Sequence, residues 1–98
     1  MNFDGTVEPF ALLTGSKVVL RTVTMIYTGR LIAVGSLELV LEDAAWIADT
    51  RRWADFLKNG VKTDGIEIEP YPDGHVAVGR GALVDACLWD HDLPREQL

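Results

Sequence analysis

The sequence predicts a mainly β fold: a small, strongly bent antiparallel barrel of five short strands, with an N-terminal helix and a helical insertion between the third and fourth strands. Three observations support this prediction. Runs rich in valine, isoleucine and threonine alternate apolar with polar side chains, which is the pattern of half-buried strands. Short connections, several of them containing glycine, join these runs. One segment in the middle of the chain has apolar residues at helical spacing instead.

The first predicted element is a helix of one or two turns between Glu8 and Gly15. Pro9 suits the first helical position, because the N–H that it lacks would have no partner there. Phe10 and Leu13, with Leu12 as a further candidate, would form an apolar face. Gly15 is expected to end the helix, since glycine is common just beyond the last helical residue.

Three strands are expected to follow as an antiparallel meander, because short connections place consecutive strands side by side. The first covers Lys17–Thr28, and a bend at Thr28–Gly29 leads into the second, Arg30–Val34. Gly35–Ser36 separates the second strand from the third, Leu37–Asp43. In the third strand the leucines share one face and two glutamates the other, so this strand should be half buried.

A short amphipathic helix is predicted within Asp49–Gly60. Trp53, Phe56 and Leu57 have i, i+3, i+4 spacing and are expected to pack onto the barrel. Asp49 or Thr50 suits the N-cap position. The charged residues of this segment, Arg51, Arg52, Asp55 and Lys58, are expected to face solvent.

The residues after this helix predict an extended arm, since Ile66 and Ile68 alternate with glutamates before a proline-containing stretch. Helix and arm together form an insertion over about residues 49–73, which we expect outside the barrel on one face. The last ten residues, Trp89–Leu98, are interpreted as a polar tail. The whole chain, residues 1–98, is expected to be one domain.

Two further strands flank a Gly–Arg–Gly corner in "VAVGRGALVD", residues Val76–Asp85. Gly79 and Gly81 would permit a bend of the backbone. Arg80 offers planar donors to a base, a phosphate or a carboxylate. The alternative is that Arg80 pairs with a carboxylate such as Glu38 or one on a neighbouring subunit. The candidate ligand or nucleic-acid site is therefore the corner of Arg80, Gly81 and Glu38.

Composition restricts the classes of function. The chain has 98 residues, 48% of them hydrophobic, which is ordinary for one folded domain. Its net charge of -6 disfavours nucleic acid as a default partner, because phosphate contacts dominate that affinity. The sequence shows no secretory signal, and no run approaches the ~20 apolar residues of a membrane span. We therefore expect a cytoplasmic protein without a membrane partner.

No group of residues predicts catalysis, and we expect no enzymatic activity, no cofactor and no metal. His75 and His91 are the only histidines. Asp90 and Asp92 flank His91, but adjacent side chains point apart in most backbones, whereas a metal needs convergent ligands. The sequence has no glycine-rich phosphate loop and no Cys–His pattern.

The tryptophans and the cysteine are given structural roles. Trp46, Trp53 and Trp89 could stack on bases, but such residues are more often part of a core or a subunit interface. Trp53 in particular is expected to pack the helix onto the barrel. Cys87 lies in an apolar run and is expected to be a small buried hydrophobe in a reducing compartment.

Two stretches of the chain resemble, in order and spacing, the two signatures of the Sm and Sm-like protein family. The first is "FALLTGSKVVLRTVTMIYTGRLIAVGSLELVLEDA" and the second is "VAVGRGALVDACL". The matching positions are Gly15, Lys17, Val19, Leu20, Gly29, Leu31, Leu39, Leu41, Asp43, Ala44, Arg80, Gly81 and Val84. The chain resembles a divergent member of bacterial or phage type.

The resemblance implies a short helix followed by a bent five-stranded sheet. It also implies a homo-oligomeric ring of about five to seven subunits, in which strand four of one subunit pairs with strand five of the next. Physical reasoning favours the same assembly. A sheet of five short strands leaves two open edges, and a domain of this size gains buried area by closing them.

The loop "AVGSLEL" departs from the family pattern. In RNA-binding members an Asp and an Asn of this loop line a base pocket beside the Arg–Gly corner. Here the Asp position falls on Val34 or Gly35 and the Asn position on Glu38. A carboxylate lacks the donors of an amide and repels phosphate. We therefore expect no binding of uridine-rich RNA in the family's manner.

These arguments predict a non-enzymatic ring subunit that acts as an assembly scaffold with weak or altered nucleic-acid binding. The main alternative is a module that binds a protein or a small ligand through the ring surface or the inserted helix. An enzyme with a site between subunits is a less favoured third hypothesis, because no acid–base pair or nucleophile is recognisable.

Overall fold

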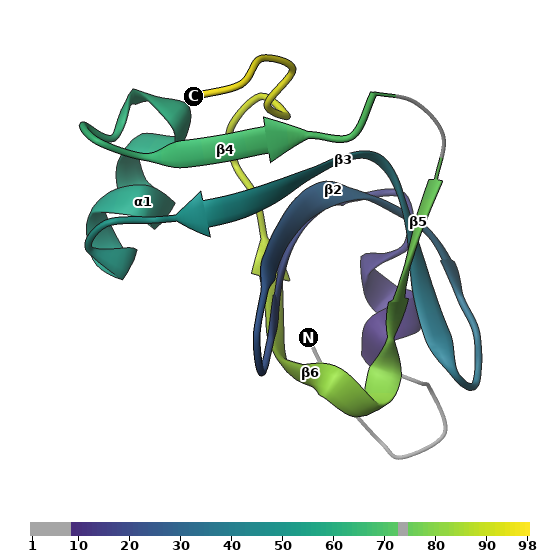
Figure 1. The fold of residues 1–98 in the computed structure, drawn as a ribbon. Helices are drawn as coiled ribbons and strands as arrows, with labels where there is room; N and C mark the ends of the chain where they lie inside the picture. The colour runs from purple at the N-terminus through teal and green to yellow at the C-terminus, as the bar shows by residue number, and fades with distance from the viewer. Residues whose placement is uncertain (1–8, 73–74) are drawn as a thin grey trace.

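The computed structural model describes residues 9–72 and 75–98. These residues form one sheet of six antiparallel strands, with one short α-helix and three 3-10 helices (Figure 1). The strand order is β4-β3-β2-β1-β6, and β5 also pairs with β3. The strands are β1 (Lys17–Thr22), β2 (Ile26–Val34), β3 (Glu38–Asp49), β4 (Glu67–Pro70), β5 (His75–Gly79) and β6 (Leu83–Leu88). The helices are η1 (Pro9–Leu13), α1 (Trp53–Asn59), η2 (Gly60–Lys62) and η3 (Arg80–Ala82).

The mainly β class is confirmed, but the prediction of a five-stranded barrel is wrong. A sixth strand, β4, lies within the segment that was predicted as an insertion. Among the described residues the sheet does not close, since β5 and β6 pair with β3 and β1 but not with each other. The described part of the N-terminal helix is the 3-10 helix η1. The Cα radius of gyration, 13.2 Å, is that of a compact domain of this length.

Strand β3 is the central strand of the sheet, and along its length it pairs first with β5 and then with β4. Its first half, Glu38–Glu42, pairs with β5, and its second half, from Ala45 to Asp49, pairs with β4. Between the halves Asp43 has a φ of 51°, in the left-handed region. The predicted strand end at Asp43 is therefore a change of partner, and the strand continues beyond it. Figure 1 shows the strong curvature of β2 and β3.

The first turn lies earlier than predicted. β1 ends at Thr22, whose hydroxyl donates to the Met25 carbonyl and accepts from the Met25 N–H, both at 2.8 Å. This local bonding lets β-branched residues form a turn. Gly29, predicted as the bend, lies inside β2 instead. A Cβ there would come within 3.0 Å of the Leu41 Cβ, so glycine is needed for the close approach of β3.

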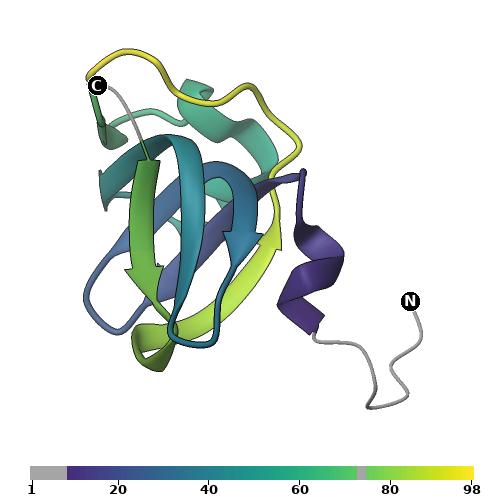
Figure 2. The same ribbon diagram turned by 90° about the vertical axis from the view of Figure 1, so that its right-hand side faces the viewer.

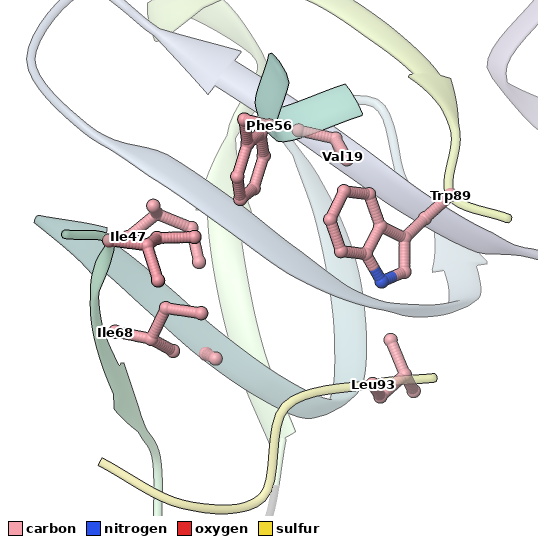
Figure 3. Packing of buried hydrophobic residues seen from close by; sticks show 8 residues of the cluster. Val19, Ile47, Phe56, Ile68, Trp89 and Leu93 are labelled. Carbon is pink, nitrogen blue, oxygen red and sulfur yellow. The ribbon is translucent and has the colours of Figure 1, made fainter. Parts of the chain in front are cut away.

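Two apolar clusters lie on opposite faces of β1, because successive side chains alternate across a strand. The η1-side core contains Val18, Leu20, Leu31, Leu39, Leu41, Ala44 and Val78, with Phe10 and Leu13 of η1 packed against it. The α1-side core contains Val19, Ala45, Ile47, Phe56, Ile66, Ile68, Trp89 and Leu93 (Figure 3). Figure 2 shows η1 beside the sheet and the C-terminal segment crossing above it.

The predicted insertion and the predicted polar tail are both structural parts of the α1-side core. Ile66 and Ile68 are buried, and β4 pairs with β3, so the segment does not lie outside the sheet. In the tail Trp89 is only 2% exposed and Leu93 is also buried. The prediction of a polar tail was wrong because Trp89 and Leu93, separated by polar residues, both pack into the α1-side core.

Helix α1 packs onto the sheet as predicted but begins later. The ring of Phe56 is fully buried and lies 5.6 Å from that of Trp53. The predicted cap by Asp49 or Thr50 is wrong, since the N-cap residue is Arg52 and has no side-chain cap. Asp49 instead accepts from the N–H of Arg51, at 2.7 Å. In the described part of the chain, no helix combines the length and the apolar character needed to cross a membrane.

Candidate functional site

The Gly–Arg–Gly corner is the 3-10 helix η3, which joins β5 to β6. The interpretation of its glycines as residues needed for the bend is wrong. Gly79 has φ -65° and ψ 130°, which any residue adopts, and Gly81 is not in the left-handed region. A Cβ added at either glycine would meet nothing within 4 Å. The fold of one subunit therefore gives no reason for glycine at these two exposed positions.

Arg80 connects the corner to the β2–β3 loop and to η1. Its Nη1 donates to the Gly35 carbonyl at 2.9 Å, and its backbone N–H donates to the Leu37 carbonyl, also at 2.9 Å. Its guanidinium carbon lies 5.3 Å from the centre of the Phe10 ring. These contacts give Arg80 a structural role within the subunit, because the guanidinium holds three separate segments together.

Glu38 belongs to the same corner. It lies opposite Gly79 in the β3–β5 register, and its carbonyl accepts from the Gly35 N–H at 2.7 Å. Its carboxylate covers Gly35 so closely that a Cβ on that glycine would collide with Oε1. The structure thus brings Arg80, Gly81 and Glu38 to one corner, where Arg80 donates to the Gly35 carbonyl and the Glu38 carboxylate covers the same glycine.

Two sheet edges are open on the two sides of this corner. Within the described residues β5 pairs only with β3, and β6 only with β1. Val84 and Leu88 of β6 are 60% and 55% exposed, which is unusual for apolar side chains of a strand. An unpaired strand edge is a template for a further strand. The corner therefore carries two backbone surfaces that are able to bind a strand.

An ion pair across β1 and β6 lies near one of these edges. Arg21 of β1 and Asp85 of β6 are in register, and the guanidinium Nε donates to Asp85 Oδ1 at 2.8 Å. The hydrogen bond from Arg21 lowers the pKa of the Asp85 carboxyl below its ordinary value. On its other side Arg21 lies 4.6 Å from the Trp53 ring centre. Trp53 is thus enclosed by Arg21 and Phe56, as its predicted packing role requires.

The remaining candidate residues also have structural surroundings. His91 Nε2 donates to the Leu57 carbonyl at 2.8 Å, near the end of α1, and its ring lies edge-on to Trp89. Among the described residues, no group of three or more His, Cys, Asp or Glu side chains is placed to hold a metal ion. Cys87 is half buried beside the α1-side core, and this burial raises the pKa of its thiol.

Sequence reasoning missed a cavity at the opposite end of the molecule. It has a volume of about 320 Å³ and lies between the bend of β3, the end of β4 and the C-terminal segment. We call it the proline pocket, because Pro70, Pro72 and Pro94 line it. Asp43 and Arg95 form an ion pair at this pocket, with Nη1 to Oδ1 at 2.8 Å. The pocket depends on the C-terminal segment folding back, which no local pattern indicates.

Comparison with known proteins adds no assignment: no family model matches this chain, and no curated protein matches it.

Proposed function

We propose that this chain is the subunit of a homo-oligomeric ring of Sm-like type, in which β5 of one subunit pairs with β6 of the next. The observation that carries the proposal is the pair of open edges joined by η3, within the described residues. Pairing two different edges is a head-to-tail contact, which closes into a ring when the rotation between subunits fits. Such pairing would satisfy both rows of backbone groups at once.

The side chains at this corner support the same assembly. Val84 and Leu88 would be covered by a neighbouring strand, and burying them would stabilise the contact. The empty space beside Gly79 and Gly81 leaves room for close approach of another backbone. A neighbouring subunit would therefore explain the two glycines that the fold of a single subunit does not require.

The ring is proposed as a non-enzymatic scaffold in the cytoplasm with weak or altered nucleic-acid binding. Each subunit adds a net charge of -6, and Glu38 would recur around a shared opening. Like charges around an opening create a repulsive potential toward phosphate. A single arginine–base contact contributes about 1–3 kcal/mol, which does not offset that background at moderate salt.

Native mass spectrometry at several protein concentrations tests the assembly. We expect a single species at about five to seven times the subunit mass of 10.8 kDa. A monomer at every concentration would refute the ring.

Titration of fluorescent oligouridine at low and at physiological ionic strength tests the nucleic-acid part. We expect no submicromolar binding at physiological salt. Submicromolar binding that is lost in Arg80→Ala would contradict this reading of the corner. Replacing Glu38→Asn together with Val34→Asp is the converse test, and a gain of binding would show that the geometry of the family's pocket persists.

A small-ligand-binding module is the second candidate function, and the proline pocket favours it. The pocket lies within one subunit and is formed without either open edge. Ring formation and ligand binding can therefore be tested separately.

A further inference from the structure

The proline pocket is built from three segments that are distant in sequence. Asp43 and Ala44 come from the bend of β3, Pro70 to Pro72 from the end of β4, and Pro94 and Arg95 from the C-terminal segment. The volume of about 320 Å³ is at the lower end of the range for small-molecule sites. A pocket of this size suits a small metabolite rather than a polymer.

An ion pair between Asp43 and Arg95 supplies both charges at this pocket. Arg95 Nη1 and Asp43 Oδ1 lie 2.8 Å apart, and the two side chains are 66% and 40% exposed. An exposed ion pair contributes little to stability, so folding alone does not account for it. Each group can make further hydrogen bonds, since a carboxylate has a second oxygen and a guanidinium has five N–H donors. A ligand with both charges would engage both groups.

The backbone at Asp43 supplies an independent observation. Its φ of 51° lies in the left-handed region, which residues other than glycine adopt uncommonly and aspartate more often than most. Strained residues of this kind concentrate at functional sites, where the side chain is needed in spite of the cost. Glycine would relieve the strain here but would remove the carboxylate.

The walls of the pocket are rigid and partly apolar. The proline rings have a fixed φ. The Tyr71 ring is stacked on Tyr27, with ring centres 6.5 Å apart, and the Tyr71 N–H donates to the Ala44 carbonyl at 2.9 Å. Burial raises the pKa of the Tyr71 hydroxyl above its ordinary value. The apolar part of a ligand would contact prolines that are already in place.

We propose that the proline pocket binds a small zwitterion of the α-amino-acid class, with its ammonium group at Asp43 and its carboxylate at Arg95. Two opposite charges in contact match a ligand whose own opposite charges are one carbon apart. The arginine suits a carboxylate, since its planar donors can bind both oxygens. The proposal goes beyond ring assembly and does not depend on it, because one subunit supplies every lining residue.

The test is an NMR titration of the full chain with the common L-amino acids, one at a time. We expect saturable shifts of the backbone amides of Asp43, Tyr71 and Arg95 with at least one of them. The N-acetyl and the amide derivatives of that amino acid, which each lack one charge, should bind at least about tenfold more weakly. Absence of saturable shifts at these amides with every amino acid, or equal binding of the derivatives, overturns the proposal.

Variants distinguish the pocket from a general charge effect. Asp43→Asn and Arg95→Gln should abolish the shifts, whereas Arg30→Gln should not. Arg30 is a matched control, because it also forms an exposed ion pair, with Glu42 at 3.5 Å. Asp43→Gly, which permits the left-handed backbone but removes the carboxylate, should lose binding. Unchanged binding in Asp43→Gly or Arg95→Gln refutes the assignment.

Measuring the same titration on the Val84→Pro variant separates the two proposals. If that variant is a monomer and still binds, the pocket functions without the ring. If the wild type proves to be a monomer, the ring proposal fails while the titration still decides the pocket.

Discussion

The edge of the sheet at β4 is covered by the chain itself, whereas the edges at β5 and β6 are open within the described residues. At the β4 end the chain covers its own edge: the Ile68 N–H donates to the Leu98 carbonyl, and the Leu98 N–H donates to the Ile68 carbonyl, both at 2.9 Å. At the η3 corner, by contrast, β5 and β6 have no second partner in the described residues. The C-terminal segment thus protects one edge from pairing with other chains, while the edges beside Arg80 are left open to them.

The same contrast holds for side chains. Near the β4 end, Trp89 and Leu93 close the α1-side core, and Lys17 Nζ fastens the segment by donating to the His91 carbonyl at 2.7 Å. On β6, Val84 and Leu88 remain exposed. Edge exposure in this small domain is therefore selective: one edge is covered and two are open within the described residues. Regions that the chain covers should decide stability, and regions that it leaves open should decide assembly.

The largest expected effect on stability is in the α1-side core, next to the edge that the C-terminal segment covers. Phe56→Ala should lower the free energy of unfolding by about 3–5 kcal/mol, because it empties the centre of the α1-side core. Chemical denaturation measured by fluorescence and circular dichroism gives this value. Ala54→Gly is a control on the same helix, and its exposed position should limit the loss to about 1 kcal/mol. Equal losses in the two variants would mean that α1 is not part of the core.

On the open side, Val84→Pro should abolish assembly and leave the subunit folded. Val84 has no partner in the β1–β6 register, and Leu83 before it has ψ 134°, which proline accepts in a preceding residue. Val84 stands at the register shift of β6, and proline there removes its backbone N–H donor. Native mass and circular dichroism report the two effects, and Val84→Thr is the control that keeps the N–H. An intact oligomer in Val84→Pro would exclude β6 from the contact.

A smaller effect on the free energy of unfolding is expected at Thr28, in β2 between β1 and β3. Its hydroxyl is fully buried, has no hydrogen-bond partner among residues 9–72 and 75–98, and lies in register with Val19 and Ala45. Thr28→Val should raise the free energy of unfolding by about 1 kcal/mol, because it removes an unsatisfied polar group. Thr28→Ser, which keeps the hydroxyl and loses a methyl group, should lower it. A loss of stability in Thr28→Val would show that the hydroxyl is satisfied.

The smallest effect on stability is expected for the Arg21–Asp85 pair, whose side chains are 36% and 46% exposed. Because the folded-state pKa of Asp85 is lowered, its contribution is present above the unfolded pKa of about 3.9 and is lost as the pH falls through the folded value. Asp85→Asn should therefore be slightly less stable than the wild type at pH 7, and the difference should be smaller at about pH 3. Denaturation curves at both pH values check this. If the stability difference between Asp85→Asn and the wild type does not depend on pH, the difference arises from packing and not from the charge of Asp85.

The sequence predicted the parts of the fold that local pattern controls. The strands β5 and β6 on either side of Arg80 are those that the alternation of apolar and polar residues predicted. Helix α1 has the predicted buried face, with Phe56 at its centre. The start of α1 was placed too early because the left-handed Arg51, with φ 58°, is not a residue type that signals such a conformation. The Gly29 prediction failed because local patterns do not distinguish a glycine that turns the chain from one that admits a neighbouring strand.

Long-range features were beyond prediction from one sequence. Strand β4 has only four residues and ends at a proline, so its alternation was compatible with an exposed arm. The burial of Trp89 depends on where the C-terminal segment returns, which the neighbouring residues do not specify. The candidate corner was found because Arg80 stands out between glycines. The proline pocket was missed because Asp43 and Arg95 are 52 positions apart.

The pairing of β3 with both β4 and β5 should make unfolding of the domain cooperative. Because β3 carries the ladders of both β4 and β5, neither half of the molecule can open its sheet without disturbing the same strand. Amide hydrogens in β3 should accordingly exchange with solvent only through global unfolding, whereas those of η1 should exchange through local fraying. The domain would then behave as one foldon in spite of its two separate cores, and a ligand or a neighbouring subunit bound at either end would slow exchange at the other.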